Sequence, residues 1–125
     1  MANAGDGSVR VLWGEDLTAV GRIELGDDSD NVRVDTAYNV LVGYGKSALA
    51  VIDPVNLSKT EIRLKAHPEG FRIDDAETRV LVNVPAAREI AVTNLSVGST
   101  RSLPTQGAGS NFPMIDGEAH RVRVV

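Results

Sequence analysis

The amino-acid sequence repeats itself with a period of about 41 residues. A short apolar stretch at residues 9–12 returns in the same pattern at 49–52 and 90–93. A second marker, an apolar residue followed by aspartate, stands at 34–35, 73–74 and 115–116. A single repeat unit cannot bury its apolar face alone, so such units stack against one another. The sequence therefore predicts about three stacked units, and the repeat starts and stops inside a unit.

Within each unit, apolar and polar residues alternate with a period of two, which is typical of β-strands. Turn-forming residues such as Gly26, Asp53 and Pro54 separate the alternating stretches. No helical stretch of the length that a βαβ unit needs interrupts them, so the pattern predicts an antiparallel all-β fold. We expect twelve strands, near residues 9–13, 19–25, 31–35, 39–43, 49–53, 59–64, 71–74, 79–84, 90–94, 98–103, 112–116 and 120–125.

Four short strands in each repeat of this length predict a β-propeller of four-stranded antiparallel blades. The chain holds three blade equivalents in a single partial propeller domain, residues 1–125. Residues 1–8 are polar and rich in glycine, and we expect them to be flexible. Closed propellers have typically about four to eight blades, so three blades cannot close a ring alone.

Composition limits the classes of partner. Hydrophobic residues make up 42% of the chain and aromatic residues only 4%, so the core is built from aliphatic side chains that suit strands. The net charge of −4 argues against nucleic-acid binding. There is no cysteine, and no stretch approaches the roughly 20 apolar residues that span a membrane. Residues 1–8 lack the pattern of a signal peptide, which leaves the compartment open.

Several motifs resemble the YVTN-repeat family of β-propellers, which includes YncE-like proteins. The family's Pro-Glu-Gly pattern matches Pro68, Glu69 and Gly70, its second strand is similar to residues 80–83, and its third strand, ending in Ile-Asp, is similar to 51–54. The third unit departs from the pattern at 94–95 and 111–113. The resemblance covers nearly the whole chain and implies a propeller of usually about seven blades, often in exported proteins.

The family's strand order implies that 31–35, 71–74 and 112–116 are innermost strands beside the channel. Residues 31–64 and 71–103 are then complete blades, whereas 9–25 is an outer half-blade and 112–125 an inner half-blade. Two chains would supply six blades if the final hairpin of each paired with the first hairpin of the other. We therefore expect a homodimer that closes as a six-bladed ring through these complementary half-blades.

Candidate ligand-binding residues lie in the loops at one end of the channel. By the family pattern these loops are 26–31, 65–70 and 105–113, with 43–48 and 84–89 near the same face. Arg33 and Arg72 stand between apolar neighbours in innermost strands, where they either attract an anion or form salt bridges between blades. The candidate ligand-binding residues are Asn31, Arg33, His67, Glu69, Arg72 and Asn111.

Three patterns that suggest chemistry have simpler explanations. Gly45, Lys46 and Ser47 lack the earlier glycine and the following helix of a phosphate-binding loop, so a hairpin turn is favoured. The acidic residues 27–31 lack the glycine and glutamate of a calcium loop. The His67–Glu69 pair could act in acid–base chemistry or begin a metal site, but a role in shaping the loop is favoured. We predict no catalytic residue, no metal site and no cofactor.

The sequence favours a non-catalytic binding or scaffold module that takes a small molecule or a protein at the channel-end loops. One alternative is a metal-dependent enzyme of the lactonase or lyase kind, which would need carboxylates or histidines where the inner strands carry arginine. Another is a truncated gene product without a specific activity. The identity of the ligand does not follow from the sequence, because the propeller fold supports many functions.

Overall fold

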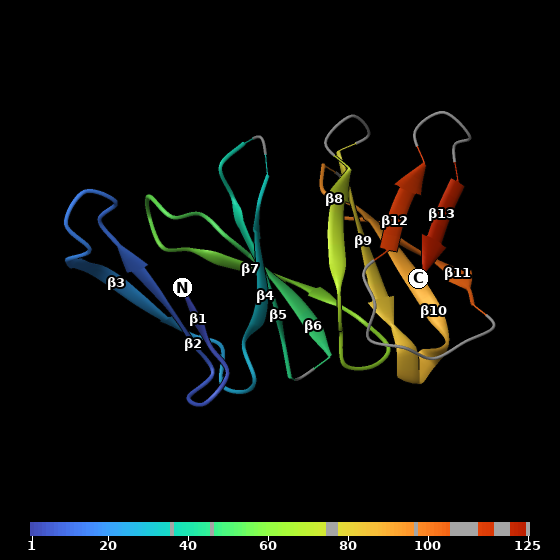
Figure 1. Cartoon of the computed structure of the whole chain (residues 1–125), viewed down its shortest axis with the longest axis horizontal. Helices are drawn as coiled ribbons and strands as arrows, with labels where there is room; N and C mark the ends of the chain where they lie inside the picture. The colour runs from blue at the N-terminus through green and yellow to red at the C-terminus, as the bar shows by residue number, and fades with distance from the viewer. Residues whose placement is uncertain are drawn as a thin grey trace. The chain divides into compact units, whose positions relative to one another are not determined.

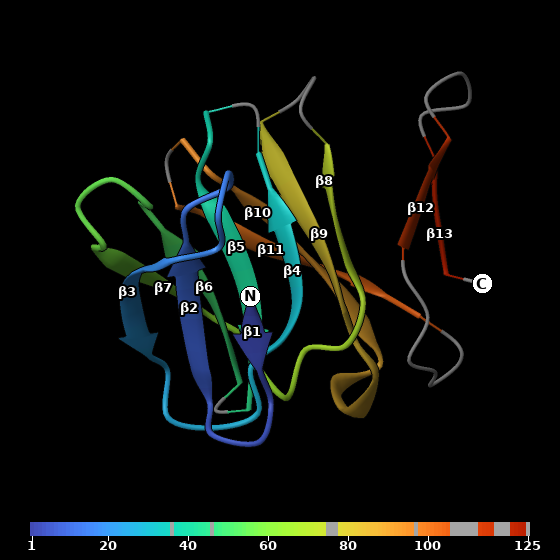
Figure 2. The same cartoon turned by 60° about the vertical axis from the view of Figure 1, so that its left-hand side comes forward.

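The chain folds as two compact units, Met1–Arg63 and Leu64–Val125. The computed structural model describes residues 1–35, 37–45, 47–74, 78–96, 98–105, 113–116 and 121–124, the last two ranges as backbone strands only. Both units are built from antiparallel sheets, which appear from two directions in Figure 1 and Figure 2. Among the described residues, no helix is both long enough and apolar enough to cross a membrane.

The first unit contains two antiparallel sheets. A three-stranded sheet has the order β1-β2-β3, with β1 (Ala2–Asn3), β2 (Ser8–Leu12) and β3 (Ala19–Glu24). A four-stranded sheet has the order β4-β5-β6-β7, with β4 (Asp30–Val34), β5 (Val40–Tyr44), β6 (Ala48–Ile52) and β7 (Lys59–Arg63). Each strand pairs with its neighbour in the sequence, as in a blade.

The second unit repeats this plan. Its four-stranded sheet has the order β11-β10-β9-β8, with β8 (Phe71–Asp74), β9 (Arg79–Val84), β10 (Glu89–Asn94) and β11 (Thr100–Pro104). A separate hairpin pairs β12 (Pro113–Asp116) with β13 (Arg121–Val124). The short 3-10 helix η1 (Pro85–Ala87) joins β9 to β10.

The antiparallel all-β prediction is confirmed, and the twelve predicted strands correspond to β2 to β13. Their ends lie within two residues of the predicted ones, and those of β8 and β9 are the same as predicted. Two elements were not expected. Residues 1–8, predicted to be flexible, contain β1, which pairs with β2 through Ala2 opposite Val9 and Asn3 opposite Ser8. The other is η1.

Apolar side chains from the two sheets of the first unit form its core. Val9 and Ile23 of the three-stranded sheet belong to one buried cluster with Val42, Ala50 and Ile52 of the four-stranded sheet. These residues occupy every second position of their strands, so they lie on one face of each sheet. In β6 the positions between them are apolar as well. In the second unit, a buried cluster forms on β9 and β10, and a partly buried leucine of β11 packs against it; its members are Leu81, Ile90, Val92 and Leu103.

A glycine permits close packing at the edge of the first core. Leu57, in the turn after β6, packs against the cluster. A Cβ atom built on Gly21 of β3 would lie 2.5 Å from Leu57 Cδ1, which is closer than real contacts allow. Gly21 therefore makes room for the leucine of the neighbouring sheet.

The turns that follow β2, β6 and β10 show the repeat most clearly. A backbone hydrogen bond closes it between residues i and i+5, namely Trp13 N to Thr18 O, Asp53 N to Ser58 O and Asn94 N to Ser99 O, at 2.8, 3.0 and 2.9 Å. The fifth residue of each turn has a left-handed backbone, with φ of 60° at Leu17, 59° at Leu57 and 72° at Gly98. The three turns thus share one backbone form.

Candidate functional site

In the first unit, two loops lie together at one end of the four-stranded sheet. The Gly45 N–H, in the turn between β5 and β6, donates to Asp27 O in the loop after β3, at 3.0 Å. A Cβ atom on Gly45 would lie 3.1 Å from the Asp27 carboxyl group, so any side chain there would press on the loop. The predicted proximity of loops 26–31 and 43–48 is confirmed by this contact.

The acidic loop between β3 and β4 contains a buried hydroxyl. Ser29 is 2% exposed, and its Oγ has no hydrogen-bond partner among the described residues. Its neighbours include Asp27, Asp28 and Asp30. Within the described residues, however, no group of three or more histidine, cysteine, aspartate or glutamate side chains is placed to hold a metal ion. The loop connects β3 to β4.

Asn31 lies at an irregularity of the β4–β5 ladder, where the register shifts between Asp30 and Val32. Its backbone is left-handed, with φ of 53°, and its N–H donates to Asp30 Oδ1 at 2.7 Å. Such irregularities turn a side chain away from the regular alternation of a strand. Asn31 is half-buried, so part of its side chain is accessible at this end of the sheet.

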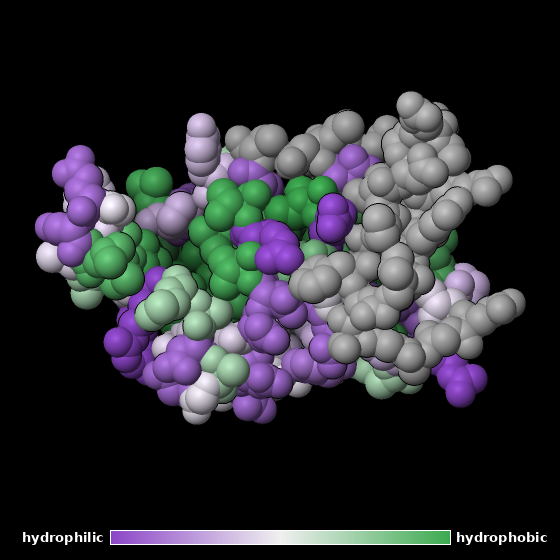
Figure 3. All heavy atoms as spheres, viewed as in Figure 1, coloured by the Kyte–Doolittle hydropathy of each residue, from purple (hydrophilic) through white to green (hydrophobic). Residues whose placement is uncertain are grey.

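Arg33 lies on β4, an edge strand of its sheet, and is exposed. It stands opposite Leu41 in the β4–β5 ladder, and its Nη1 donates to Val32 O at 2.8 Å. Next to it, Val34 is 57% exposed. Figure 3 shows hydrophobic side chains gathered over the β4–β5 hairpin with hydrophilic ones beside them. The edge of this sheet thus offers both apolar surface and a guanidinium group.

In the second unit, the loop of residues 67–70 runs alongside β9. The Glu69 N–H donates to Asn83 O at 3.0 Å, and the Asn83 N–H donates to Gly70 O at 2.9 Å. Pro68 is buried, whereas His67 and Glu69 are half-buried. The backbone of the loop is therefore fixed against the sheet, and the histidine and glutamate side chains are partly accessible.

Arg72 follows this loop on β8, the edge strand of its sheet, and is exposed. It stands opposite the fully buried Leu81, as Arg33 stands opposite Leu41 in the other unit. Asn111 lies outside the described residues. The predicted residues therefore form two groups: Asn31 and Arg33 in the first unit, and His67, Glu69 and Arg72 in the second.

An ion pair that was not predicted from the sequence lies beside loop 65–70. Lys65 Nζ lies 2.9 Å from Glu89 Oε2 and 3.3 Å from Ser102 Oγ. The Glu89 side chain is only 8% exposed, so its charge depends on this lysine for compensation. A signal was present, because Glu89 takes the place in the repeat that the buried Ala48 takes in the first unit. The pair ties loop 65–70 to the start of β10.

Tyr44 is the one tyrosine that is buried among the described residues, being 2% exposed at the end of β5. Burial raises its pKa to about 12, and a hydrogen bond with the Glu61 carboxylate acts in the same direction. Its phenol is therefore neutral at physiological pH.

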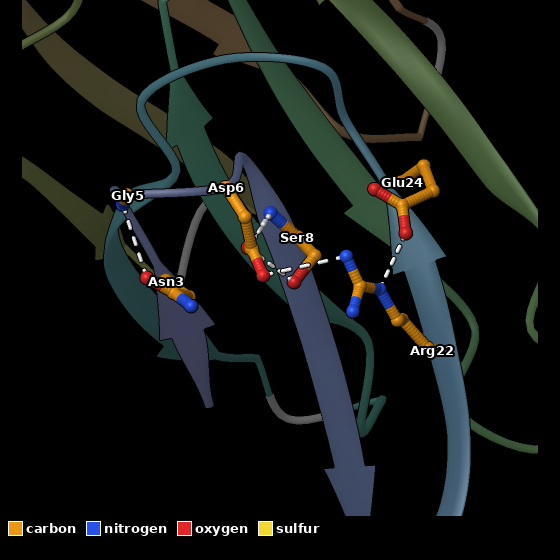
Figure 4. A network of polar contacts seen from close by, with 6 residues as sticks. All are labelled: Asn3, Gly5, Asp6, Ser8, Arg22 and Glu24. Carbon is orange, nitrogen blue, oxygen red and sulfur yellow. Dashed lines mark hydrogen bonds and ion pairs between the residues drawn. The ribbon is translucent and has the colours of Figure 1, made fainter.

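A polar network joins β2 and β3 at the start of the chain (Figure 4). Ser8 Oγ and Ser8 N donate to Asp6 Oδ1 at 2.6 and 3.0 Å, and Arg22 forms ion pairs with Asp6 and Glu24. The hydrogen bond from Ser8 lowers the pKa of Asp6, and the charge of Arg22 lowers it further. The carboxylate is thereby kept ionised beside the β2–β3 ladder.

A hollow of about 360 Å³ lies on the same pair of strands, lined by Arg10, Ala19, Val20, Gly21 and Arg22. Arg10 stands directly opposite Arg22 in the β2–β3 ladder. The two carboxylates of the network, Asp6 and Glu24, offset these two positive charges.

No protein-family model and no curated protein matches the sequence. Solved structures do match in fold. Hydrazine synthase of Kuenenia stuttgartiensis matches over 93% of this chain and 35% of its own, with 17% identity and a TM-score of 0.81. Dihydro-heme d1 dehydrogenase NirN, in complex with DHE, matches over 94% and 24%, with 15% identity and a TM-score of 0.72.

A third match is the extracellular domain of a one-component system from B. thetaiotaomicron. It covers 77% of this chain and 13% of that one, with 13% identity and a TM-score of 0.60. These structural neighbours are propeller-type proteins, so the chain has a β-propeller-like fold. It spans about a third or less of the length of each neighbour.

Proposed function

We propose that the chain is a non-catalytic propeller module, of the YVTN-repeat type, that binds a small molecule or a protein at the loops on one end of its sheets. The observation that carries the proposal is the fixed backbone of these loops. Hydrogen bonds hold loop 26–31 against Gly45 in the first unit and loop 67–70 against Asn83 in the second. Rigid loops that present partly exposed polar side chains suit binding, because little ordering is left to do.

Each unit contributes its own kind of contact. The first offers the Arg33 guanidinium on one face of β4 and exposed apolar surface at Val34 on the other face. The second offers the half-buried His67 and Glu69 in loop 65–70 and the exposed Arg72 on β8, the strand that follows. Ligand sites usually combine apolar surface with a small number of polar groups.

A titration of the isotope-labelled protein followed by NMR tests the proposal. The probe is a fragment library of neutral and anionic compounds, and we expect the shifted amides of hits to cluster at 26–33 and 65–72. His67→Ala and Glu69→Ala should weaken a hit at the second loop. Both variants keep the backbone hydrogen bonds between the loop and Asn83, so we expect them to fold. Thr60→Ala, an exposed change on β7, serves as the control and should leave binding unchanged. Shifts that appear only elsewhere would overturn the proposal.

Elemental analysis separates the binding module from the metal-dependent enzyme. Two of the structural neighbours are named as a synthase and a dehydrogenase, so the fold is compatible with enzymes. A binding module should purify without a stoichiometric metal and should not hydrolyse simple lactones. One metal ion per chain, lost together with lactone hydrolysis on chelation, would favour the enzyme.

A further inference from the structure

A cavity of about 300 Å³ lies on the four-stranded sheet of the second unit. Its lining residues come from the ends of β9 and β10, the start of β11 and the turn before it: Arg79, Val92, Asn94, Ser99, Thr100 and Arg101. β9 begins at Arg79 and β10 ends at Asn94, so the cavity lies at the end of the sheet away from η1. It is therefore separate from loops 65–70 and 84–89.

The lining is positively charged. It contains two arginines and, among the described residues, no acidic side chain. Arg79 Nε forms an ion pair with Asp74 Oδ2 at 2.9 Å, and both side chains are largely buried, at 28% and 12% exposed. This pair fixes the orientation of the Arg79 guanidinium and offsets its charge, so the exposed Arg101 supplies the net positive charge of the lining. Guanidinium groups match the geometry of carboxylate and phosphate oxygens.

The other four-stranded sheet shows that the fold does not require these charges. Arg101 stands opposite Val92, and its counterpart opposite Val51 is Thr60. The counterpart of Arg79 is Asn39. Each directly precedes a valine, Val80 or Val40, that pairs with the third strand of its sheet. The blade framework is therefore compatible with neutral residues at both arginine positions.

At a third position, the cavity has the neutral Asn94 where the first sheet has Asp53, and both residues form the same turn. Asp53 Oδ1 accepts a hydrogen bond from Val55 N at 2.8 Å, and Asn94 Oδ1 accepts the equivalent bond from Ser96 N at 2.9 Å. Asparagine thus does the structural work of aspartate without its charge.

A fourth position changes in the opposite sense, because Thr100 stands opposite Thr93 where the charged Lys59 stands opposite Ile52. The equivalent residues of the first sheet therefore carry one positive and one negative charge, whereas the lining of the cavity carries two arginines and no acidic residue among those described.

We propose that this cavity binds a small organic anion by its carboxylate or phosphate group, which contacts Arg101 and Arg79. The volume is at the lower end of the range for ligand pockets, roughly 300–1,000 Å³, so the ligand is small. Asn94 and the hydroxyl groups of Ser99 and Thr100 supply polar neighbours for the rest of the ligand. The site does not depend on the function proposed for the loops, and either can fail alone.

Isothermal titration at low salt tests the proposal, with inorganic phosphate and malonate as probes. We expect saturable binding of one anion per chain. Arg101→Thr and Asn94→Asp introduce the residues of the other sheet. Arg101→Thr removes a charged hydrogen-bond donor, and Asn94→Asp places a negative charge beside the anion. Each should weaken binding at least about tenfold. Circular dichroism should show both variants folded, since Arg101 is exposed and aspartate keeps the turn.

Arg10→Thr is the matched control. It removes the same charge from an exposed position in the first unit, so it should leave binding unchanged if the cavity is the site. Binding of phosphate alone or of malonate alone would identify the group recognised, and binding of both would indicate recognition by charge. The proposal fails if neither anion binds, or if Arg10→Thr weakens binding as much as Arg101→Thr.

Discussion

At the residue scale, two leucines occupy a conformation that glycine normally takes. Leu17 and Leu57 have left-handed backbones in the turns after β2 and β6, at the position that Gly98 occupies in the turn after β10. The left-handed region costs a residue with a side chain about 1–2 kcal/mol. Leu57 offsets this cost by packing against the core of the first unit, whereas Leu17 is 69% exposed. Only Gly98 carried a sequence signal for this turn, so the shared form became visible only in the hydrogen bonds.

The buried Tyr44 makes stability depend on pH in the alkaline range. Its folded-state pKa of about 12 lies above 10.0, the ordinary value for tyrosine. The Tyr44 phenol therefore holds its proton more strongly in the folded state than in the unfolded state. Its contribution to the free energy of unfolding is complete below about pH 10 and is lost as the pH rises toward 12. We expect the free energy of unfolding in urea to fall over this window, and the fall to be smaller in Tyr44→Phe. Tyr38, which is 78% exposed, provides the control, because Tyr38→Phe should keep the wild-type slope.

At the element scale, the long alternating strands were predictable and the shortest elements were not. β5 and β9 carry runs such as Val40-Leu41-Val42, whose β-branched pattern and flanking turns indicate a strand directly. β1 has two residues, too few to show alternation, and forms because the turn after it brings Asn3 opposite Ser8. η1 begins at Pro85, which looks like an ordinary turn residue in the sequence. Local pattern decides long strands, whereas contacts decide short ones.

Packing between the two sheets of the first unit depends on Gly21. Gly21→Val would place its Cβ 2.5 Å from Leu57 Cδ1, the end of a flexible side chain that has to turn away from the core. We therefore expect a loss of about 1 kcal/mol of stability in urea unfolding, at the low end for overpacking. Gly14→Ala is the matched control, because nothing lies within 4 Å of a Cβ there, and it should change stability by less than about 0.5 kcal/mol. Gly21→Val combined with Leu57→Ala should recover part of the loss. Equal stabilities of Gly21→Val and Gly14→Ala would show that the contact does not constrain the sheets.

At the scale of the whole molecule, the repeat predicted the fold better than the site. The 41-residue spacing led to antiparallel blades. The family resemblance placed the loops at one end, and the contact between Gly45 and Asp27 shows two of them together. The individual site residues were predicted from the family pattern. That pattern does not predict ion pairs between residues far apart in the sequence, such as Lys65 and Glu89, which are 24 residues apart. The cationic cavity was missed for a similar reason. Arg79 and Arg101 meet only because β9 and β11 both flank β10.

The homodimer with complementary half-blades stays a prediction, and β1 adds a condition to it. The final hairpin of one chain would have to pair with the edge of β2 in the other, where Ser8 and Val9 already pair with β1. The two strands then compete, and a backbone edge can satisfy only one of them. In light scattering after size exclusion we expect twice the 13.3 kDa of one chain. Deleting residues 1–3 should raise the dimer fraction, because it frees the edge.

Deleting residues 112–125 should abolish the dimer, because it removes the strands that the ring needs from each partner. Circular dichroism distinguishes the reasons for a monomer in that variant, since loss of strand signal means that the blades depend on the partner for folding. The full chain decides the matter. If it stays a folded monomer over a hundredfold range of concentration, the half-blades do not complement each other, and the exposed edge of β2 is covered by β1 alone.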